Sequence, residues 1–294
     1  MGSVKTFDPS GWTLEMALAV KRGRTVSVCI PCRNEAETVG DLVRMIDDAL
    51  VGTLVDELIL LDDDSTDGTG EVAAEAGATV VPVDVVHFFH GSARGKGNAL
   101  WASLVASKGD IVVWCDGDIT SFTPDWIVRL VIPLLLDDEL GLVKASYERP
   151  SHLGGGGRTT ELVARPLLSL FFPEIAELNQ PLAGEFAGRR TMLEAIPFAT
   201  GWGVEIGMLI DMSRRFGASS IGQVDLGVRL HRHHRLETLA IQAAEVAATL
   251  LARLPDAPEL AESVPMLRRK AGAPHELNLM VRPPVNSLAR FGTP

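Results

Sequence analysis

Short β-rich runs alternate with helical segments through the first half of the chain, and this alternation is the feature that most restricts the fold. The β-rich runs are Thr25–Ile30, Glu57–Leu61, Thr79–Val83 and Ile111–Trp114. After the first run, apolar side chains recur at helical spacing, at Val39, Leu42, Val43, Ile46 and Leu50. Strands and helices that alternate in this way form βαβ units, which place their strands in a parallel sheet. The sequence therefore predicts an α/β fold.

Changes in composition divide the chain into four parts. We expect a lead-in with one amphipathic helix at residues 1–24, a nucleotide-binding α/β half at 25–150, the remainder of the same domain at 151–254, and a proline-rich, weakly patterned tail at 255–294. The pattern in the third part and just before it favours strands at Leu142–Tyr147 and Ile221–Leu230. It favours helices at Glu161–Phe172 (kinked or interrupted at Pro166), Gly203–Phe216 and Leu236–Leu254.

Charge and composition exclude several classes of function. A net charge of −11 over 294 residues argues against general nucleic-acid binding, which needs a basic surface. We find no apolar run of about 18 residues and no basic-then-apolar leader, so we expect a cytoplasmic protein with no membrane partner. Cys29, Cys32 and Cys115 are expected to be reduced thiols, although the CxxC spacing of the first two leaves a redox pair open.

Two carboxylates, Asp116 and Asp118, follow the Ile111–Trp114 run one residue apart. Side chains at i and i+2 of an extended chain point to the same side. Mg²⁺ and Mn²⁺ prefer oxygen ligands and commonly bridge carboxylates to substrate phosphates. Because open α/β sheets bind ligands at the carboxyl ends of their strands, this pair is a candidate metal–diphosphate site. An Asp-Gly-Asp segment alone would equally suit a solvated turn.

Further polar segments follow the first two strands. They are Pro31-Cys32-Arg33-Asn34-Glu35 and Asp62-Asp63-Asp64-Ser65, and both should share one sheet edge with Asp116 and Asp118. Like charges gathered on one edge repel each other unless they serve a ligand. Helix capping by Asn34 or Ser65 is the alternative. Lys96 lies between two glycines before a helix, which suits a diphosphate, although the full P-loop pattern is absent and a solvated lysine is the alternative.

These segments, in this order, resemble a known enzyme family. IPCRNE, DDDSTDGT, GKGNALWASL and VVWCDGDI resemble the A-type nucleotide-sugar glycosyltransferases of the family 2-like superfamily. GGGGRTTELVARPLL, NQPLAGEFAGRR, FATGWGVEIGMLID and QVDLGVRLHRH resemble the glucosyl- and mannosyl-3-phosphoglycerate synthases of glycosyltransferase family 81. The resemblance spans roughly residues 25–250. It implies a GT-A fold, a homodimer, and divalent-metal-dependent transfer of a hexose to 3-phosphoglycerate with retention of configuration.

The resemblance also implies individual roles. The sugar nucleotide would be held by Pro31, Arg33, Glu35, Ser65, Lys96 and Asp116, together with backbone from Leu182 and Ala183. Mg²⁺ or Mn²⁺ would be bound by Asp118 and His231, and Glu205 would hydrogen-bond the donor hexose. With Asp116 and Asp118, Glu205 makes up the implied catalytic set. The phosphoglycerate would be bound in the second part of the domain by Gly157, Arg158, Thr160 and His233.

Two positions differ from the pattern of the glucosyl enzymes. Asp64 replaces a small residue, and His233 replaces the asparagine that usually contacts the acceptor. A carboxylate beside the base pocket would suit guanine, whose N1–H and exocyclic N2–H₂ are donors, so GDP-mannose, GDP-glucose and UDP-glucose all stay open as donors. The alternative functions are an inverting family 2 transferase with another acceptor, a nucleotidyltransferase, and a non-catalytic nucleotide-sugar-binding protein.

Overall fold

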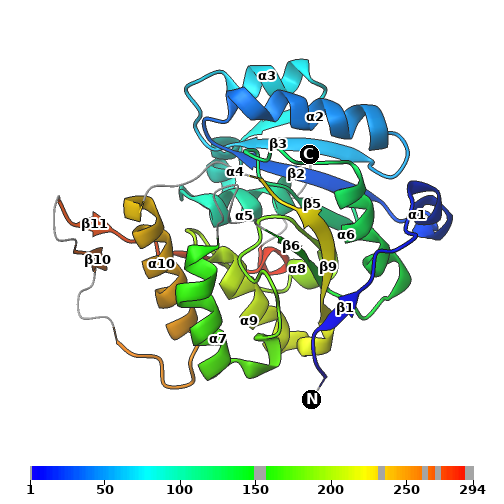
Figure 1. The fold of residues 1–294 in the computed structure, drawn as a ribbon. Coiled ribbons are helices and arrows are strands. Elements are labelled where there is room, and N and C mark those ends of the chain that lie inside the picture. The colour runs from blue at the N-terminus through cyan, green and yellow to red at the C-terminus, as the bar shows by residue number, and fades with distance from the viewer. Residues whose placement is uncertain (1, 149–156, 231–235, 260–263, 269–272, 289–294) are drawn as a thin grey trace.

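An eight-stranded, mostly parallel sheet forms the centre of the molecule (Figure 1). The computed structural model describes residues 2–148, 157–230, 236–259, 264–268 and 273–288. The strands, in their order across the sheet, are β1 (Lys5–Phe7), β9 (Ile221–Val228), β6 (Leu142–Glu148), β7 (Phe186–Arg189), β5 (Ile111–Trp114), β2 (Val26–Cys32), β3 (Glu57–Asp62) and β4 (Thr79–Pro82). Only β7 runs antiparallel to its neighbours, β5 and β6. The predicted α/β class is confirmed.

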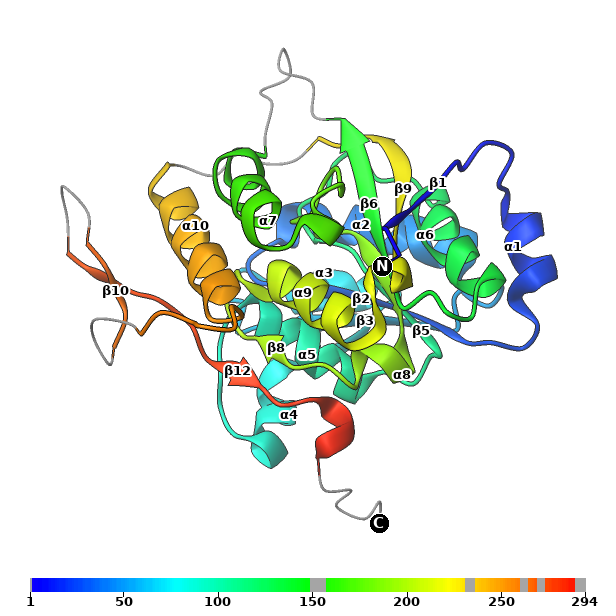
Figure 2. The ribbon, with the colours of Figure 1, turned by 90° about the horizontal axis from the view of Figure 1, so that it is seen from below.

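Helices cover both faces of this sheet, each with its own core (Figures 1 and 2). One face carries α1 (Leu14–Lys21), α2 (Ala36–Leu50), α3 (Thr69–Glu75) and α6 (Asp125–Leu136). The other carries α4 (Val83–His90), α5 (Lys96–Ala106), α7 (Arg165–Phe171), α9 (Val204–Phe216) and α10 (Leu236–Leu251). Smaller helical pieces are η2 (Thr160–Ala164, a π-helix), η3 (Pro173–Ile175), α8 (Arg190–Leu193), η4 (Ala218–Ser220) and η5 (Val285–Ser287).

The first strand continues past Ile30, where we expected it to stop. Pro31 pairs with Leu61 of β3, and the strand ends at Cys32. The backbone carbonyl of Cys29 points toward β5, where it accepts a hydrogen bond from the backbone N–H of Cys115. Backbone groups two residues apart in a strand point to the same side, so the nitrogen of Pro31 also points toward β5. Because β5 has already ended at Trp114, the missing proline N–H breaks no ladder hydrogen bond there.

Several elements were not predicted. Apart from Asp125 and Arg129, which form an ion pair on one side, the segment of α6 is a continuous apolar run, and periodicity alone does not separate such a run from a strand. The short β7, with a glycine at its centre, is stabilised by two neighbouring strands and not by its own composition. No interruption occurs at Pro166: helical backbone runs without a break from residue 158 to 171, and the irregularity is the π-helical stretch η2, which passes directly into α7 just before this proline.

The C-terminal tail is less irregular than its composition indicated. Its strand β12 (Val281–Arg282) pairs with β8 (Phe198–Ala199), and β10 (Met266–Leu267) pairs with β11 (His275–Glu276). Arg282 is buried, stacks over Trp101 and donates to the side chain of Asn98 at 2.9 Å. The β12 part of the tail is therefore packed against the main domain near the start of α5, whereas the β10–β11 pair extends away from it (Figures 1 and 2).

The start of α5 packs against β8 without any gap. A Cβ atom on Gly97 would collide with the carbonyl oxygen of Ala199 and with Val204. Both neighbours belong to packed backbone and core, and they have little room to move. Only glycine allows this approach, which holds the adjacent Lys96 in place.

We predict that Gly97→Ala lowers the free energy of unfolding by about 2 kcal/mol or more, because overpacking a rigid contact is destabilising. Gly207→Ala in α9 is the matched control. There the new Cβ would contact the flexible end of Arg253 at 3.0 Å, and alanine also favours the helix. Urea denaturation of both variants checks this, and equal stability losses would contradict it.

Candidate active site

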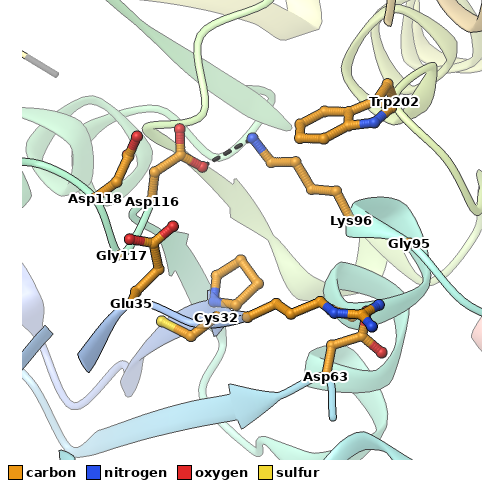
Figure 3. A pocket seen from close by; sticks show the side chains of 12 residues that line it. Cys32, Glu35, Asp63, Gly95, Lys96, Asp116, Gly117, Asp118 and Trp202 are labelled. Carbon is orange, nitrogen blue, oxygen red and sulfur yellow. Dashed lines mark ion pairs between the residues drawn. The ribbon is translucent and has the colours of Figure 1, made fainter. Parts of the chain in front are cut away.

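A cavity of about 340 Å³ opens at the carboxyl ends of β2, β3 and β5 (Figure 3). Parallel pairing of these three strands brings their following segments to one edge, as expected from the sequence. The cavity is lined by Pro31, Cys32, Arg33, Glu35, Asp63, Gly95, Lys96, Ala99, Asp116, Gly117, Asp118 and Trp202. Six of the residues assigned by resemblance are among them: Pro31, Arg33, Glu35, Lys96, Asp116 and Asp118.

A buried ion-pair chain connects three of the expected site residues. The Lys96 ammonium lies 2.8 Å from Asp116 and 2.8 Å from Glu205, and Figure 3 shows its side chain pointing toward Asp116. Glu205 is the second residue of α9, as predicted. Burial lowers the pKa of Lys96, but the two carboxylates outweigh it and raise that pKa above its ordinary value. Lys96 therefore carries its positive charge throughout the physiological pH range.

Arg229 is a second cation of the site, one that the sequence did not single out. Its guanidinium lies 3.0 Å from Asp116, 3.6 Å from Asp118 and 2.9 Å from the fully buried Glu185. The backbone turns at Gly117 and does not continue as an extended strand, yet both aspartates face this one guanidinium. Burial raises the pKa of Asp116, but Lys96 and Arg229 bring it down to about 2. Burial and the neighbouring Asp116 raise the pKa of Asp118.

A third cation, Lys144, lies beneath the site. It is 1% exposed, its ammonium donates to the backbone carbonyl of Ala183, and it lies 4.2 Å from the ring centre of Phe186. Burial lowers the pKa of Lys144 to about 8. The same loop includes Gly184, where a Cβ would collide with the carboxylate of Asp116. Lys144 thus fixes the backbone of a loop that the resemblance assigns to the donor.

The charges leave room for a divalent cation. Lys96, Lys144 and Arg229 face four carboxylates, those of Asp116, Asp118, Glu185 and Glu205, so this cluster carries one net negative charge. Within the described ranges, Asp118 has one ion-pair partner, Arg229, at a distance beyond hydrogen bonding. Its oxygens therefore suit a hard cation. No group of three or more His, Cys, Asp or Glu residues with metal-binding geometry occurs among the described residues. The expected metal ligand His231 lies outside those residues, as does His233, which was expected at the acceptor.

Ser65 and its neighbours serve to join loops. The Ser65 hydroxyl accepts from the backbone N–H of Asn34 at 3.1 Å, and the Asn34 side chain accepts from Thr66 at 2.9 Å. Neither residue caps a helix, so the capping alternative is wrong. Asp64 is exposed and is not among the residues that line the cavity, whereas Asp63 is.

Three of the four residues assigned to the acceptor lie at or just before the start of η2. Gly157 has a φ of +73°, Arg158 is exposed, and Thr160 is buried as the first residue of the π-helix. The hydroxyl of the adjacent Thr159 is buried and has no hydrogen-bond partner within the described part of the chain. π-helices are frequent at functional sites, so this segment stays a candidate for phosphate binding.

The three cysteines are all free and buried. Burial raises the pKa of Cys29 to about 12 and that of Cys32 above its ordinary value. Low-pKa, accessible thiols are the reactive ones, so these residues have the properties of structural thiols and not of a redox pair.

The functional residues that were missed are charged side chains in or beside strands. Lys144 follows Leu142 and Val143 in β6, and Arg229 directly follows β9. A charged residue within an apolar strand run is a sign that its charge is paired in the fold. That sign was present at Lys144, whereas nothing local marked Glu185; Asp63 lies in the Asp62–Ser65 segment that the sequence had already placed at this edge.

Comparison with known proteins agrees with this geometry. The model of the family "Glycosyl transferase family 2" matches residues 27–196. Glucosyl-3-phosphoglycerate synthase of Mycolicibacterium paratuberculosis is 46% identical over 263 residues, 86% of this chain and 80% of that protein. The synthase of Petrotoga mobilis is 39% identical over 292 residues, 93% of this chain and 90% of that protein.

The chain belongs to the glucosyl-3-phosphoglycerate synthase family. A solved structure of the Mycobacterium tuberculosis member, in complex with Mn²⁺, UDP-glucose and phosphoglyceric acid, is 43% identical with a TM-score of 0.88 and covers 97% of this chain and 99% of that one. A second structure of that protein holds Mg²⁺ and UDP. Membership of this glycosyltransferase family and the GT-A-like sheet confirm the resemblance seen in the sequence.

We predict a pH effect from Lys144. Its pKa of about 8 is below the ordinary value of 10.5, so between these pH values the unfolded chain binds more protons than the folded one. The free energy of unfolding should therefore rise by about 3 kcal/mol at most from pH 8 to 10.5 through this group. Lys144→Met should lack that rise, whereas the exposed control Lys108→Met should keep it. Urea denaturation at several pH values measures this, and identical pH profiles for the wild type and Lys144→Met would contradict it.

Proposed function

We propose that this protein transfers glucose from UDP-glucose to 3-phosphoglycerate with retention of configuration. The observation that carries the proposal is the Lys96 ammonium, held between Asp116 and Glu205 in a cavity at the carboxyl ends of parallel strands. A fixed, buried cation beside paired carboxylates suits a nucleoside diphosphate that carries a sugar. Family members related to this chain are glucosyl-3-phosphoglycerate synthases, and one has been solved with UDP-glucose bound.

UDP-glucose is favoured over GDP-mannose and GDP-glucose for two reasons. The argument for guanine depended on Asp64, which is exposed and outside the cavity lining. The M. tuberculosis structure contains the uridine nucleotide. In this proposal Pro31, Arg33 and Glu35 contact the nucleoside, with Ser65 fixing the adjacent loop. The backbone of Leu182 and Ala183 lies beside the hexose.

A divalent cation completes the site in this proposal. Asp118 and His231 would hold Mg²⁺ or Mn²⁺, which would neutralise the donor diphosphate and favour its departure. The charge balance supports this assignment. One added divalent cation would change the net charge of the buried cluster from −1 to +1, and a diphosphate would then be attracted.

Glu205 orients the sugar and does not attack it. Its carboxylate is paired with Lys96 at 2.8 Å and lies in the first turn of α9, and both contacts stabilise the anion and weaken it as a nucleophile. The acceptor hydroxyl oxygen then bonds to the anomeric carbon on the face from which the diphosphate leaves. The bond from that carbon to the phosphate oxygen breaks, and the leaving phosphate takes the proton of the acceptor hydroxyl. This path retains configuration.

The remaining proposals concern assembly and location. We propose a homodimer, and the exposed apolar side chains of the η2–α7 segment and the start of α10 supply a candidate contact face: Leu162, Leu170, Phe171 and Leu236. A cytoplasmic location fits the three free cysteines. None of the described helices has the length and apolarity needed to span a membrane. Light scattering after gel filtration tests the dimer.

Release of the nucleoside diphosphate tests the main proposal. The protein is incubated with Mn²⁺, 3-phosphoglycerate and one of UDP-glucose, GDP-glucose or GDP-mannose, and the product anomer is read by proton NMR. We expect turnover with UDP-glucose, an α-linked product, and loss of activity in EDTA. An inverted product would support the inverting transferase, and binding of the donor without turnover would support a sensor. Turnover with GDP-mannose alone would overturn the assignment of the donor.

Arg158 should act on the acceptor and not on the donor. Losing a charged phosphate contact costs on the order of 2–5 kcal/mol, so Arg158→Ala should raise the KM for 3-phosphoglycerate by roughly thirtyfold or more. The KM for UDP-glucose should stay within about twofold of the wild type. Arg44→Ala, in the Asp41 ion pair on α2, is the control and should change neither value. An unchanged acceptor KM in Arg158→Ala would place the phosphate site elsewhere.

A further inference from the structure

Asn278 of the C-terminal tail joins three segments of the chain with separate hydrogen bonds. Its side-chain amide donates to the carbonyl of Arg94 at 2.6 Å, and its side-chain oxygen accepts from the Thr200 hydroxyl at 2.7 Å. Its backbone N–H donates to Glu245 of α10 at 2.8 Å. The sequence separations of these contacts are 184, 78 and 33 residues, so no local pattern reports them.

Two of the joined segments lead directly into the donor cavity. Arg94 precedes Gly95 and Lys96, and Thr200 precedes Trp202 and Glu205. Trp202, Gly95 and Lys96 line the cavity, and Lys96 pairs with Glu205 across the two segments at 2.8 Å. Asn278 therefore connects, outside the cavity lining, the same two segments that the ion pair connects inside it.

Glu245 completes this arrangement. It is 3% exposed, and its second carboxylate oxygen accepts from the backbone N–H of Trp202 at 2.8 Å. Thr200 is also fixed, because its backbone N–H donates to Met280 of the tail at 2.9 Å. Both oxygens of a buried carboxylate are thus used to hold backbone, which gives the Gly201–Gly203 turn one defined position.

Asn278 is in close contact with the Gly95 and Gly201 segments. A Cβ on Gly95 would lie 2.7 Å from the Thr200 carbonyl oxygen and 2.9 Å from the Asn278 amide nitrogen. A Cβ on Gly201 would collide with Glu245 and lie 2.6 Å from the Asn278 carbonyl oxygen. The two segments and the tail are in direct contact, so a small displacement of Asn278 would be passed to Lys96 and Trp202.

We propose that Asn278 is a positioning residue of the donor site, which sets the separation of the Lys96 and Glu205 segments. The amide suits this place because one of its atoms must donate to a carbonyl while the other accepts from a hydroxyl. Aspartate cannot make both contacts, since its second oxygen would face the Arg94 carbonyl oxygen. The role assigned to the tail rests on the proposed function, because the donor is UDP-glucose in that proposal.

The test compares Asn278→Ala and Asn278→Asp with the control Glu276→Ala, an exposed residue of the same tail. Calorimetry measures UDP-glucose binding in the presence of Mn²⁺, and steady-state kinetics measure the KM of each substrate. We expect both Asn278 variants to weaken donor binding and raise the donor KM by roughly tenfold or more. The KM for 3-phosphoglycerate should stay within about twofold, and the control should match the wild type. If an Asn278 variant does not fold, Thr200→Val is measured in its place, because it removes the hydrogen bond from the Thr200 hydroxyl to Asn278.

The outcomes separate this inference from the proposed function. Wild-type protein that binds no UDP-glucose overturns the proposed function and the donor-site role of Asn278 with it. Wild-type protein that binds UDP-glucose, with Asn278 variants that bind it equally well, overturns the inference alone. An equal loss of affinity for donor and acceptor would mean a general loss of structure, and this also overturns the positioning role.

Discussion

The buried ammonium of Lys96 between Asp116 and Glu205 is the interaction on which the active site depends. Burying a lysine ammonium lowers the stability of the fold unless carboxylates pair with it. The fold must therefore bring three elements that are distant in the sequence into contact. The start of α5 supplies the cation, the end of β5 supplies one carboxylate, and the start of α9 supplies the other. The close contacts of Gly97 with Ala199 and of Gly184 with Asp116 are consequences of this convergence.

Further charged side chains are buried around this ion pair, although burying charge does not by itself stabilise the fold. Burial disfavours the charged form of Lys144 and lowers its pKa to about 8, and Arg229 is enclosed by three carboxylates. Such groups destabilise a core unless they are fully paired. Their arrangement is explained if substrates and a cation complete the charge balance, as we propose. The same charges fix the loop that carries Ala183, so electrostatics and loop geometry are coupled.

The C-terminal tail lies outside the alternating strands and helices of the main domain, yet it contacts segments that carry site residues. Its composition indicated irregular chain, yet Asn278 and Arg282 contact the segments on either side of Lys96. Asn278 accepts from the Thr200 hydroxyl at 2.7 Å, and Arg282 donates to the carbonyl of Gly91 at 2.6 Å. The tail thus contributes to the position of residues that are far away in the sequence.

Local pattern was enough to predict the alternation of strands and helices, and with it the shared edge of Arg33, Asp63, Asp116 and Asp118. This is because side-chain periodicity reports secondary structure, and parallel pairing puts all carboxyl ends on one side. The antiparallel β7, the partners of Arg229, the buried place of Lys144 and the contacts of Asn278 were decided by the tertiary structure. Each depends on contacts between segments that are far apart in the sequence, such as the contact of Arg229 with Asp116, which are 113 residues apart. Neither the periodicity nor the spacing of residues in the sequence specifies such contacts.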